Sequence, residues 1–120
     1  MTNSNDFLKQ LSEEFGLEYI QLSRVSAFLY YPNFYDIWLV CNFGSGENKI
    51  SINCLNRVYI NDDYTAELME GGSEVYNMWA ITAIRQRLAR TVKQAKDVIE
   101  SIKNKKIQDK IKELNKDFEN

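Results

Sequence analysis

Histidine is missing from this chain of 120 residues. Without it the chain cannot build a Ser-His-Asp triad, a Cys-His pair or a histidine-ligated zinc site. Any catalysis would have to rest on carboxylates, lysine, tyrosine or a lone cysteine. We therefore assign no catalytic residue, no metal ligand and no cofactor, and we expect a protein that is not an enzyme.

Cysteine is scarce, and export signals are lacking. Cys41 and Cys54 fall about 13 Å apart in the strand pairing given below, whereas disulfide-linked Cα atoms lie within about 7 Å. We expect two buried free thiols.

The first residues do not show the basic segment followed by an apolar segment that is typical of a secretory signal. No apolar run reaches the roughly 18 residues of a membrane span. We therefore expect a cytoplasmic protein in a reducing setting.

Glycine and proline are also few, and all of them lie between residues 16 and 72. The stretch 73–120 therefore lacks helix breakers, which predicts a long C-terminal helix. Its apolar residues recur at helical spacing up to Ile102, and then a five-residue step leads to Ile107. We expect the helix to break or shift register across residues 103–106. Residues 103–120 would then form a separate terminal helix that folds back or makes oligomer contacts.

Charge divides the chain into two parts. Residues 1–80 hold four Lys or Arg against eleven Asp or Glu, a net −7, and residues 81–120 hold eleven against six, a net +5. Together they give the overall charge of −2. Five acidic residues form a group before the basic helix: Asp62, Asp63, Glu67, Glu70 and Glu74. We expect this acidic group to face the basic helix, within the molecule or across a dimer.

The pattern before the basic helix predicts a single α+β domain over residues 1–120. Ser4 or Asn5 can cap a first helix, and Gly16 can end it. The period then changes to two, which predicts an antiparallel meander of three strands over residues 25–30, 35–43 and 49–54. A fourth strand is expected at 57–60 and a turn at 61–63, followed by either a short helix, which we prefer, or an edge strand over 64–70.

One strand register places the apolar residues of the meander on a single face. It sets Leu29 opposite Ile37 and Leu39 opposite Ile52, and the C-terminal helix would pack on this face. The other face would carry Phe28, Tyr30, Trp38 and Val40. In this register Phe28 lies directly opposite Trp38. Either the N-terminal helix covers this second face, or it is a dimer surface or a ligand platform.

Three arginines of the basic helix are candidate binding residues. We expect Arg87 and Arg90 on its exposed side. Arg85 falls at the edge of the apolar stripe, where it would pair with a carboxylate such as Asp36 or line a pocket for a phosphate or carboxylate group.

These features favour a small intracellular binding protein that acts as an oligomer. An adaptor, an immunity-type protein or a phage-encoded inhibitor would fit, with a protein partner, a second copy or both. The alternative is recognition of a nucleotide or nucleic acid by the three arginines, with Tyr30, Trp38 or Trp79 stacking on a base. The acidic overall charge disfavours that alternative.

A third hypothesis is a metal-dependent nuclease. Asp36, Glu47 and Lys49 have the order of such a site. Two of them, Glu47 and Lys49, fall in or beside a glycine-rich turn, where the side chains would be solvated and poorly positioned, so this hypothesis is disfavoured.

Overall fold

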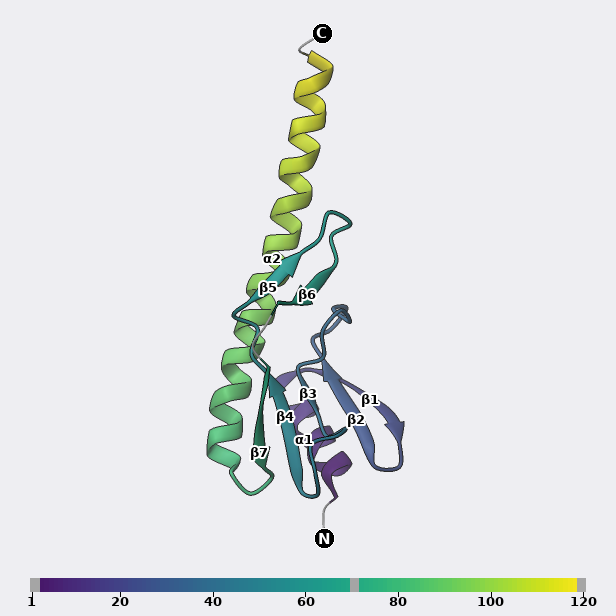
Figure 1. Cartoon of the computed structure of the whole chain (residues 1–120), viewed down its shortest axis with the longest axis vertical. Coiled ribbons are helices and arrows are strands. Elements are labelled where there is room, and N and C mark those ends of the chain that lie inside the picture. The colour runs from purple at the N-terminus through teal and green to yellow at the C-terminus, as the bar shows by residue number, and fades with distance from the viewer. Residues whose placement is uncertain (1–2, 70–71, 119–120) are drawn as a thin grey trace.

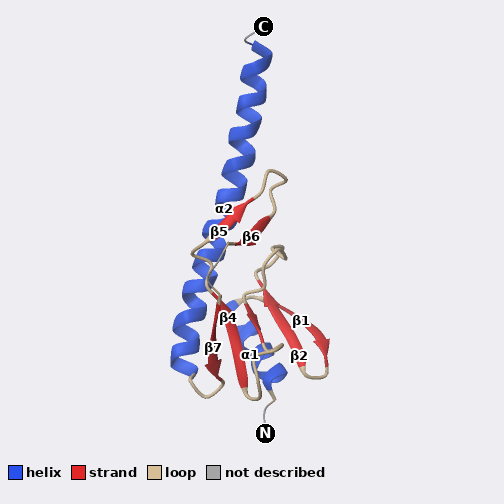
Figure 2. Cartoon of the chain, in the orientation of Figure 1, coloured by secondary structure: helices blue, strands red, loops and turns tan. Residues whose placement is uncertain are grey.

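An N-terminal helix, an antiparallel sheet and one long C-terminal helix make up the protein, as the α+β prediction expected (Figure 1). The computed structural model describes residues 3–69 and 72–118. Its elements in chain order are α1 (Ser4–Phe15), β1 (Glu18–Ser23), β2 (Ser26–Tyr30), β3 (Val40–Cys41), β4 (Lys49–Asn53), β5 (Val58–Ile60), β6 (Ala66–Leu68), β7 (Ser73–Asn77) and α2 (Ile81–Phe118). The main sheet has the order β1-β2-β3-β4-β7, and β5 and β6 pair separately (Figure 2).

The cap of helix α1 lies one residue before Ser4 and two before Asn5, the two predicted caps. Asn3 is the cap, and its side-chain oxygen accepts a hydrogen bond from the Asp6 N–H at 2.8 Å. Ser4 lies in the first turn beside Asn5, which is buried. Gly16 ends the helix in the left-handed region, with φ at 67°, as predicted.

The predicted meander is present in outline but its register is wrong. Leu29 lies opposite Val40 rather than Ile37, a displacement of three residues. Ile52 lies opposite Val40 rather than Leu39, a displacement of one. The cause is the segment 31–39, which forms a loop after a turn at Asn33, where φ is 65°. Residues 35–39 of this loop were predicted to be strand because Ile37 and Leu39 alternate with polar or aromatic neighbours, and the loop does bury both of them.

Three further predictions about strands need correction. Residues 18–23 form β1, which we did not predict. The short helix preferred for 64–70 is wrong and the alternative, a strand, is present as β6, which pairs with the predicted fourth strand, β5, across the expected turn at 61–63. Residues 73–77 form the edge strand β7 rather than the start of the long helix. Absence of glycine and proline permits a helix, but the free edge of β4 offered this segment a ladder of hydrogen bonds instead.

Both helices pack on the same face of the sheet. Strand residues on that face include Ala27, Leu29, Val40 and the pair Ile50 and Ile52, all of them fully buried. They share one core cluster with side chains of the two helices: Leu8, Leu11, Ile84, Leu88, Ala95 and Val98. Leu39 and Ile52 are buried in this cluster, as predicted, although their strand register differs from the prediction.

Helix α2 runs without a break from Ile81 to Phe118, so of the two alternatives expected at 103–106 the break is wrong and a shift of the apolar stripe remains. It passes beside β4 and the β5–β6 hairpin and then projects beyond the rest of the chain (Figure 1). The molecule is consequently elongated, with extents of 68 × 23 × 23 Å. Because the helix extends beyond the domain, its last turns do not pack on the sheet of the same molecule.

Candidate functional site

The apolar stripe of α2 changes sides along the helix. Each residue advances the side-chain direction by about 100°. Ile84, Leu88 and Ala95, which face the sheet, therefore fall within about 40° of one direction. Ile107 and Leu114 point about 140° and 120° away from Ile84, on the far side of the helix. The five-residue step seen in the sequence therefore marks a rotation of the stripe on a straight helix, not a break.

We call residues 103–118 the tail segment, and Ile107, Ile111 and Leu114 the tail stripe. These three side chains lie on successive turns and are 55%, 44% and 50% exposed, respectively. They follow the spacing of four and then three residues that pairs helices in coiled coils. The same amphipathic pattern is typical of helix faces that pack against an apolar surface.

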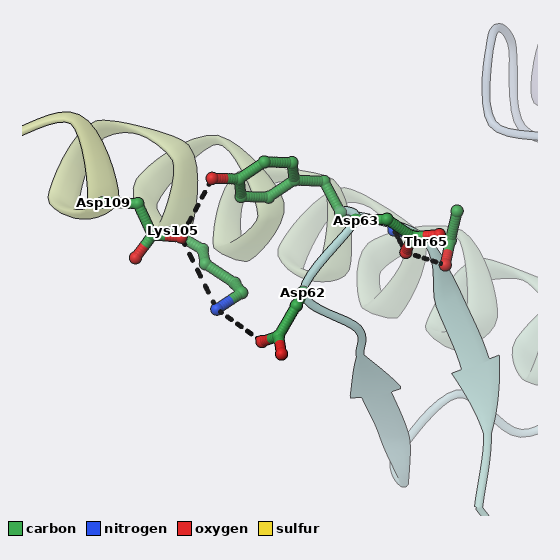
Figure 3. A network of polar contacts seen from close by, with 6 residues as sticks. Asp62, Asp63, Thr65, Lys105 and Asp109 are labelled. Carbon is green, nitrogen blue, oxygen red and sulfur yellow. Dashed lines mark hydrogen bonds and ion pairs between the residues drawn. The ribbon is translucent and has the colours of Figure 1, made fainter.

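The opposite side of the tail segment is polar and contacts the β5–β6 hairpin (Figure 3). The Tyr64 hydroxyl donates to the Asp109 carboxylate at 2.9 Å. Lys105 lies 3.7 Å from both Asp62 and Asp109, and the ammonium of Lys106 lies 5.3 Å from the centre of the Tyr64 ring. The expected contact between acidic group and basic helix is thus made within the molecule at Asp62. These contacts lie on the side of the helix opposite the tail stripe, so they leave the tail stripe exposed.

The Tyr64–Asp109 bond also affects protonation. The Asp109 carboxylate accepts a hydrogen bond from the protonated Tyr64 hydroxyl, and its negative charge opposes a second negative charge on the phenol. Both effects raise the pKa of Tyr64 above its usual value. The Tyr64 hydroxyl therefore remains protonated, and able to donate this bond, to a higher pH than an ordinary tyrosine.

A second exposed apolar surface lies on the sheet face away from both helices. Phe28 is at its centre, with the rings of Tyr30, Trp38 and Phe43 at 6.4, 6.2 and 6.3 Å, and Tyr35 packs on Tyr30 at 5.7 Å. We call these five residues the aromatic surface. Phe43 is 61% exposed and Tyr35 is 51% exposed. The predicted pairing of Phe28 with Trp38 is present as an edge-to-face contact, although the strand register differs.

Helix α1 does not cover the aromatic surface, so the first of our two explanations is wrong. Leu8 and Leu11 pack in the core with Ala27 and Leu29. Phe28 alternates with these strand residues and therefore points to the other face. In the view of Figure 1 α1 lies behind the sheet. The expectation that Val40 shares the aromatic face is also wrong, because it is paired with Leu29 and buried in the core.

Contrary to the prediction of an exposed side chain, Arg87 is buried. It is 8% exposed, and its guanidinium donates to Thr91 Oγ1 at 3.3 Å and to Gln94 Oε1 at 3.1 Å. Thr91 in turn donates to the Asn53 carbonyl at 2.7 Å, and Gln94 accepts from the Leu55 N–H at 3.1 Å. Arg87 thus belongs to a buried network that joins α2 to the end of β4, which is a structural role.

The remaining candidate residues are dispersed. Arg85 pairs with Glu14 of α1 at 2.8 Å, and Asp36 instead accepts from the Ala66 N–H at 2.8 Å. Arg90 and Trp79 are exposed, the latter in the connection between β7 and α2. The arginines lie on the helix side of the sheet and Phe28, Tyr30 and Trp38 on the other side, so the structure does not bring the two groups together.

The residues of the nuclease hypothesis also remain apart. Asp36 lies in the loop before β3, whereas Glu47 and Lys49 are exposed in and beside the β3–β4 turn. Across residues 3–69 and 72–118, no group of three or more metal-binding side chains was found.

Both cysteines are free thiols; Cys41 is buried as predicted, but Cys54 is only partly buried. Burial raises the pKa of the Cys41 thiol.

An open groove of about 570 Å³ lies between the 31–36 loop, the β5–β6 hairpin and α2. Its walls include Tyr31, Tyr64, Ile102 and Lys106. The volume is in the range of small-molecule sites. Of the candidate site residues predicted from the sequence, the groove holds Asp36 alone, so it assembles none of the predicted sites.

Comparisons with known proteins identify no relative: no family model, no curated protein and no solved structure matches the chain. Among the helices of the described part of the chain, none is long and apolar enough to cross a membrane.

Proposed function

We propose that this chain is a non-enzymatic binding protein that acts as an oligomer through the projecting part of α2. The observation that carries the proposal is the tail stripe: Ile107, Ile111 and Leu114 lie on one side of the helix, exposed, and directed away from the protein's own core. A single solvent-exposed apolar residue is ordinary, but three on successive turns form a contact surface.

The energetic reason is the burial of apolar area. Complete burial of one Ile or Leu side chain is worth about 1.5–3 kcal/mol, and these three are each near half exposure in the isolated chain. Association would also remove exposed aromatic area if the partner contacts the sheet. The hairpin contacts at Tyr64 and Lys105 support the helix without using this side, so the stripe is available to a partner.

The test is the molecular mass of the full chain in solution, measured by light scattering over a wide range of concentration. We expect the wild type to associate and the variant Ile107→Gln/Ile111→Gln/Leu114→Gln to be monomeric. The matched control, Lys112→Gln/Glu113→Gln/Lys116→Gln, places the same three glutamines on the other sides of the same turns and should associate like the wild type. Circular dichroism would establish that both variants keep the helix, since glutamine is a good helix former.

Two results would overturn the proposal. The wild type could remain a monomer at every concentration. Alternatively, the tail-stripe variant could associate as strongly as the wild type and the control, which would place the contact elsewhere.

A further inference from the structure

We infer that the aromatic surface of one molecule is the docking site for the tail segment of a second copy of this chain. The inference rests on the proposed function and adds the surface that receives the tail stripe. It follows from three observations: what the tail can reach, the apolar area on each surface, and the charge of the two parts.

The tail cannot reach its own aromatic surface. Helix α2 is continuous and carries the tail away from the sheet (Figure 2). Ile107 and Leu114 also point away from the side of α2 that packs on the core. Both helices lie on one face of the sheet, and the aromatic surface lies on the other. Only a second molecule can therefore bring a tail stripe to this surface.

The two surfaces match in kind and in size. From Ile107 to Leu114 the helix rises about 10 Å, and the ring of Phe28 lies within 6.2–6.4 Å of three neighbouring ring centres. Two exposed aliphatic side chains extend the apolar area along the same sheet face: Ile20, opposite Phe28, and Val75 of β7. Proteins commonly recognise an amphipathic helix by binding its apolar face to a hydrophobic groove.

Charge favours this pairing over contact between two tails. Residues 103–118 carry six lysines and three acidic residues, a net +3, so two tails side by side would repel each other. The aromatic surface belongs to the first 80 residues, whose net charge is −7. Glu18 lies opposite Tyr30 and accepts a hydrogen bond from Tyr35 at 2.5 Å, which places a carboxylate at the edge of the aromatic surface. Lys103 and Lys110 border the tail stripe, within about 70° of its centre.

The test is complementation between two variants of the full chain. The tail variant is Ile107→Gln/Ile111→Gln/Leu114→Gln, and the surface variant is Tyr35→Gln/Phe43→Gln. Both substituted aromatic residues are more than half exposed, so the fold should tolerate the changes. The matched control is Tyr59→Gln/Met69→Gln, which changes two equally exposed residues on the β5–β6 hairpin.

We expect each variant alone to be monomeric and the control to associate normally. An equimolar mixture of the tail and surface variants should associate, more weakly than the wild type, because a mixed pair keeps one intact tail and one intact aromatic surface. Light scattering of the mixture would measure this recovery. A fluorescent label on one variant would identify that variant in the associated fraction.

Other outcomes contradict the inference in distinct ways. If the surface variant associates like the wild type while the tail variant does not, the tail has a different docking site, and the proposed function stands without this inference. If both variants are monomeric and the mixture does not recover association, the two surfaces do not contact each other. If the wild type does not associate, both proposals fail together.

Discussion

Ile84 and Ile107 lie on nearly opposite sides of the same uninterrupted helix. Ile84 is fully buried against the sheet, whereas Ile107 is more than half exposed. The 23 residues between them turn the side-chain direction by about 140°. One helix therefore serves two surfaces: its first part completes the core of its own domain, and its last turns present an apolar stripe to the outside.

Removal of the Arg87 side chain should reduce stability. In Arg87→Ala, Thr91 and Gln94 lose a buried partner, and we expect a loss of about 1–3 kcal/mol in the free energy of unfolding. Arg90→Ala, three residues along the same helix at an exposed position, should change it by no more than about 0.5 kcal/mol. Urea unfolding of both variants measures this. Equal, small effects would show that Arg87 is not part of a structural network.

A pair of buried amides joins α1 to the sheet. Asn42 donates to Asn5 Oδ1 at 2.6 Å, and its own oxygen accepts from the Ala27 N–H at 2.8 Å. In Asn42→Ala these two groups lose their partner, at a cost of about 1–3 kcal/mol for each group left unpaired. The unfolding midpoint in urea should therefore fall clearly. The control is Asn104→Ala, on an exposed part of α2, and a similar fall in that variant would refute the role of the pair.

The bond from Tyr64 to Asp109 should contribute stability that depends on pH. Because the folded-state pKa of Tyr64 is raised, the contribution is complete below the unfolded-state pKa and is lost as the pH rises through the folded-state pKa. At neutral pH Tyr64→Phe should be less stable than the wild type, and this difference should disappear in alkali. Urea unfolding over a series of pH values checks this, with Tyr59→Phe of the same hairpin as the control. A difference that is constant with pH would contradict the assignment.

The two thiols should differ in reactivity. Cys41 is buried and its pKa is raised, so little thiolate forms there, whereas Cys54 is partly exposed. Alkylation followed by peptide mass spectrometry should find Cys54 modified well before Cys41. Faster modification of Cys41 would indicate that the β3 region opens more readily than its burial implies.

The sequence was sufficient for the fold class and for the position of the core, but not for strand pairing. Period-two alternation correctly indicated that Leu29 and Ile52 are interior residues. Alternation could not distinguish a strand from a loop that also buries Ile37 and Leu39, so the register moved by three residues. Pairing depends on the number of residues in the connection, which hydrophobic pattern alone does not determine.

The candidate residues show the same limit at the level of single side chains. The step from Ile102 to Ile107 was recognised, but it fits a kinked helix as well as a straight one with a rotated stripe. Only the continuous α2 of the structure decides between them. Arg87 was expected in solvent because charged residues usually lie there, and its buried partners Thr91 and Gln94 come from the packing of α2 on β4.

Concentration-dependent hydrogen exchange of the tail segment tests the central claim most directly, namely that the tail stripe is unpartnered in one molecule and covered in the assembly. In dilute solution the amides of residues 107–116 should exchange much faster than those of residues 84–98, whose helix surface packs on the core. As concentration rises, we expect protection of the tail amides to increase in the wild type but not in the tail variant. Tail protection that is the same at every concentration, in both proteins, would contradict the account.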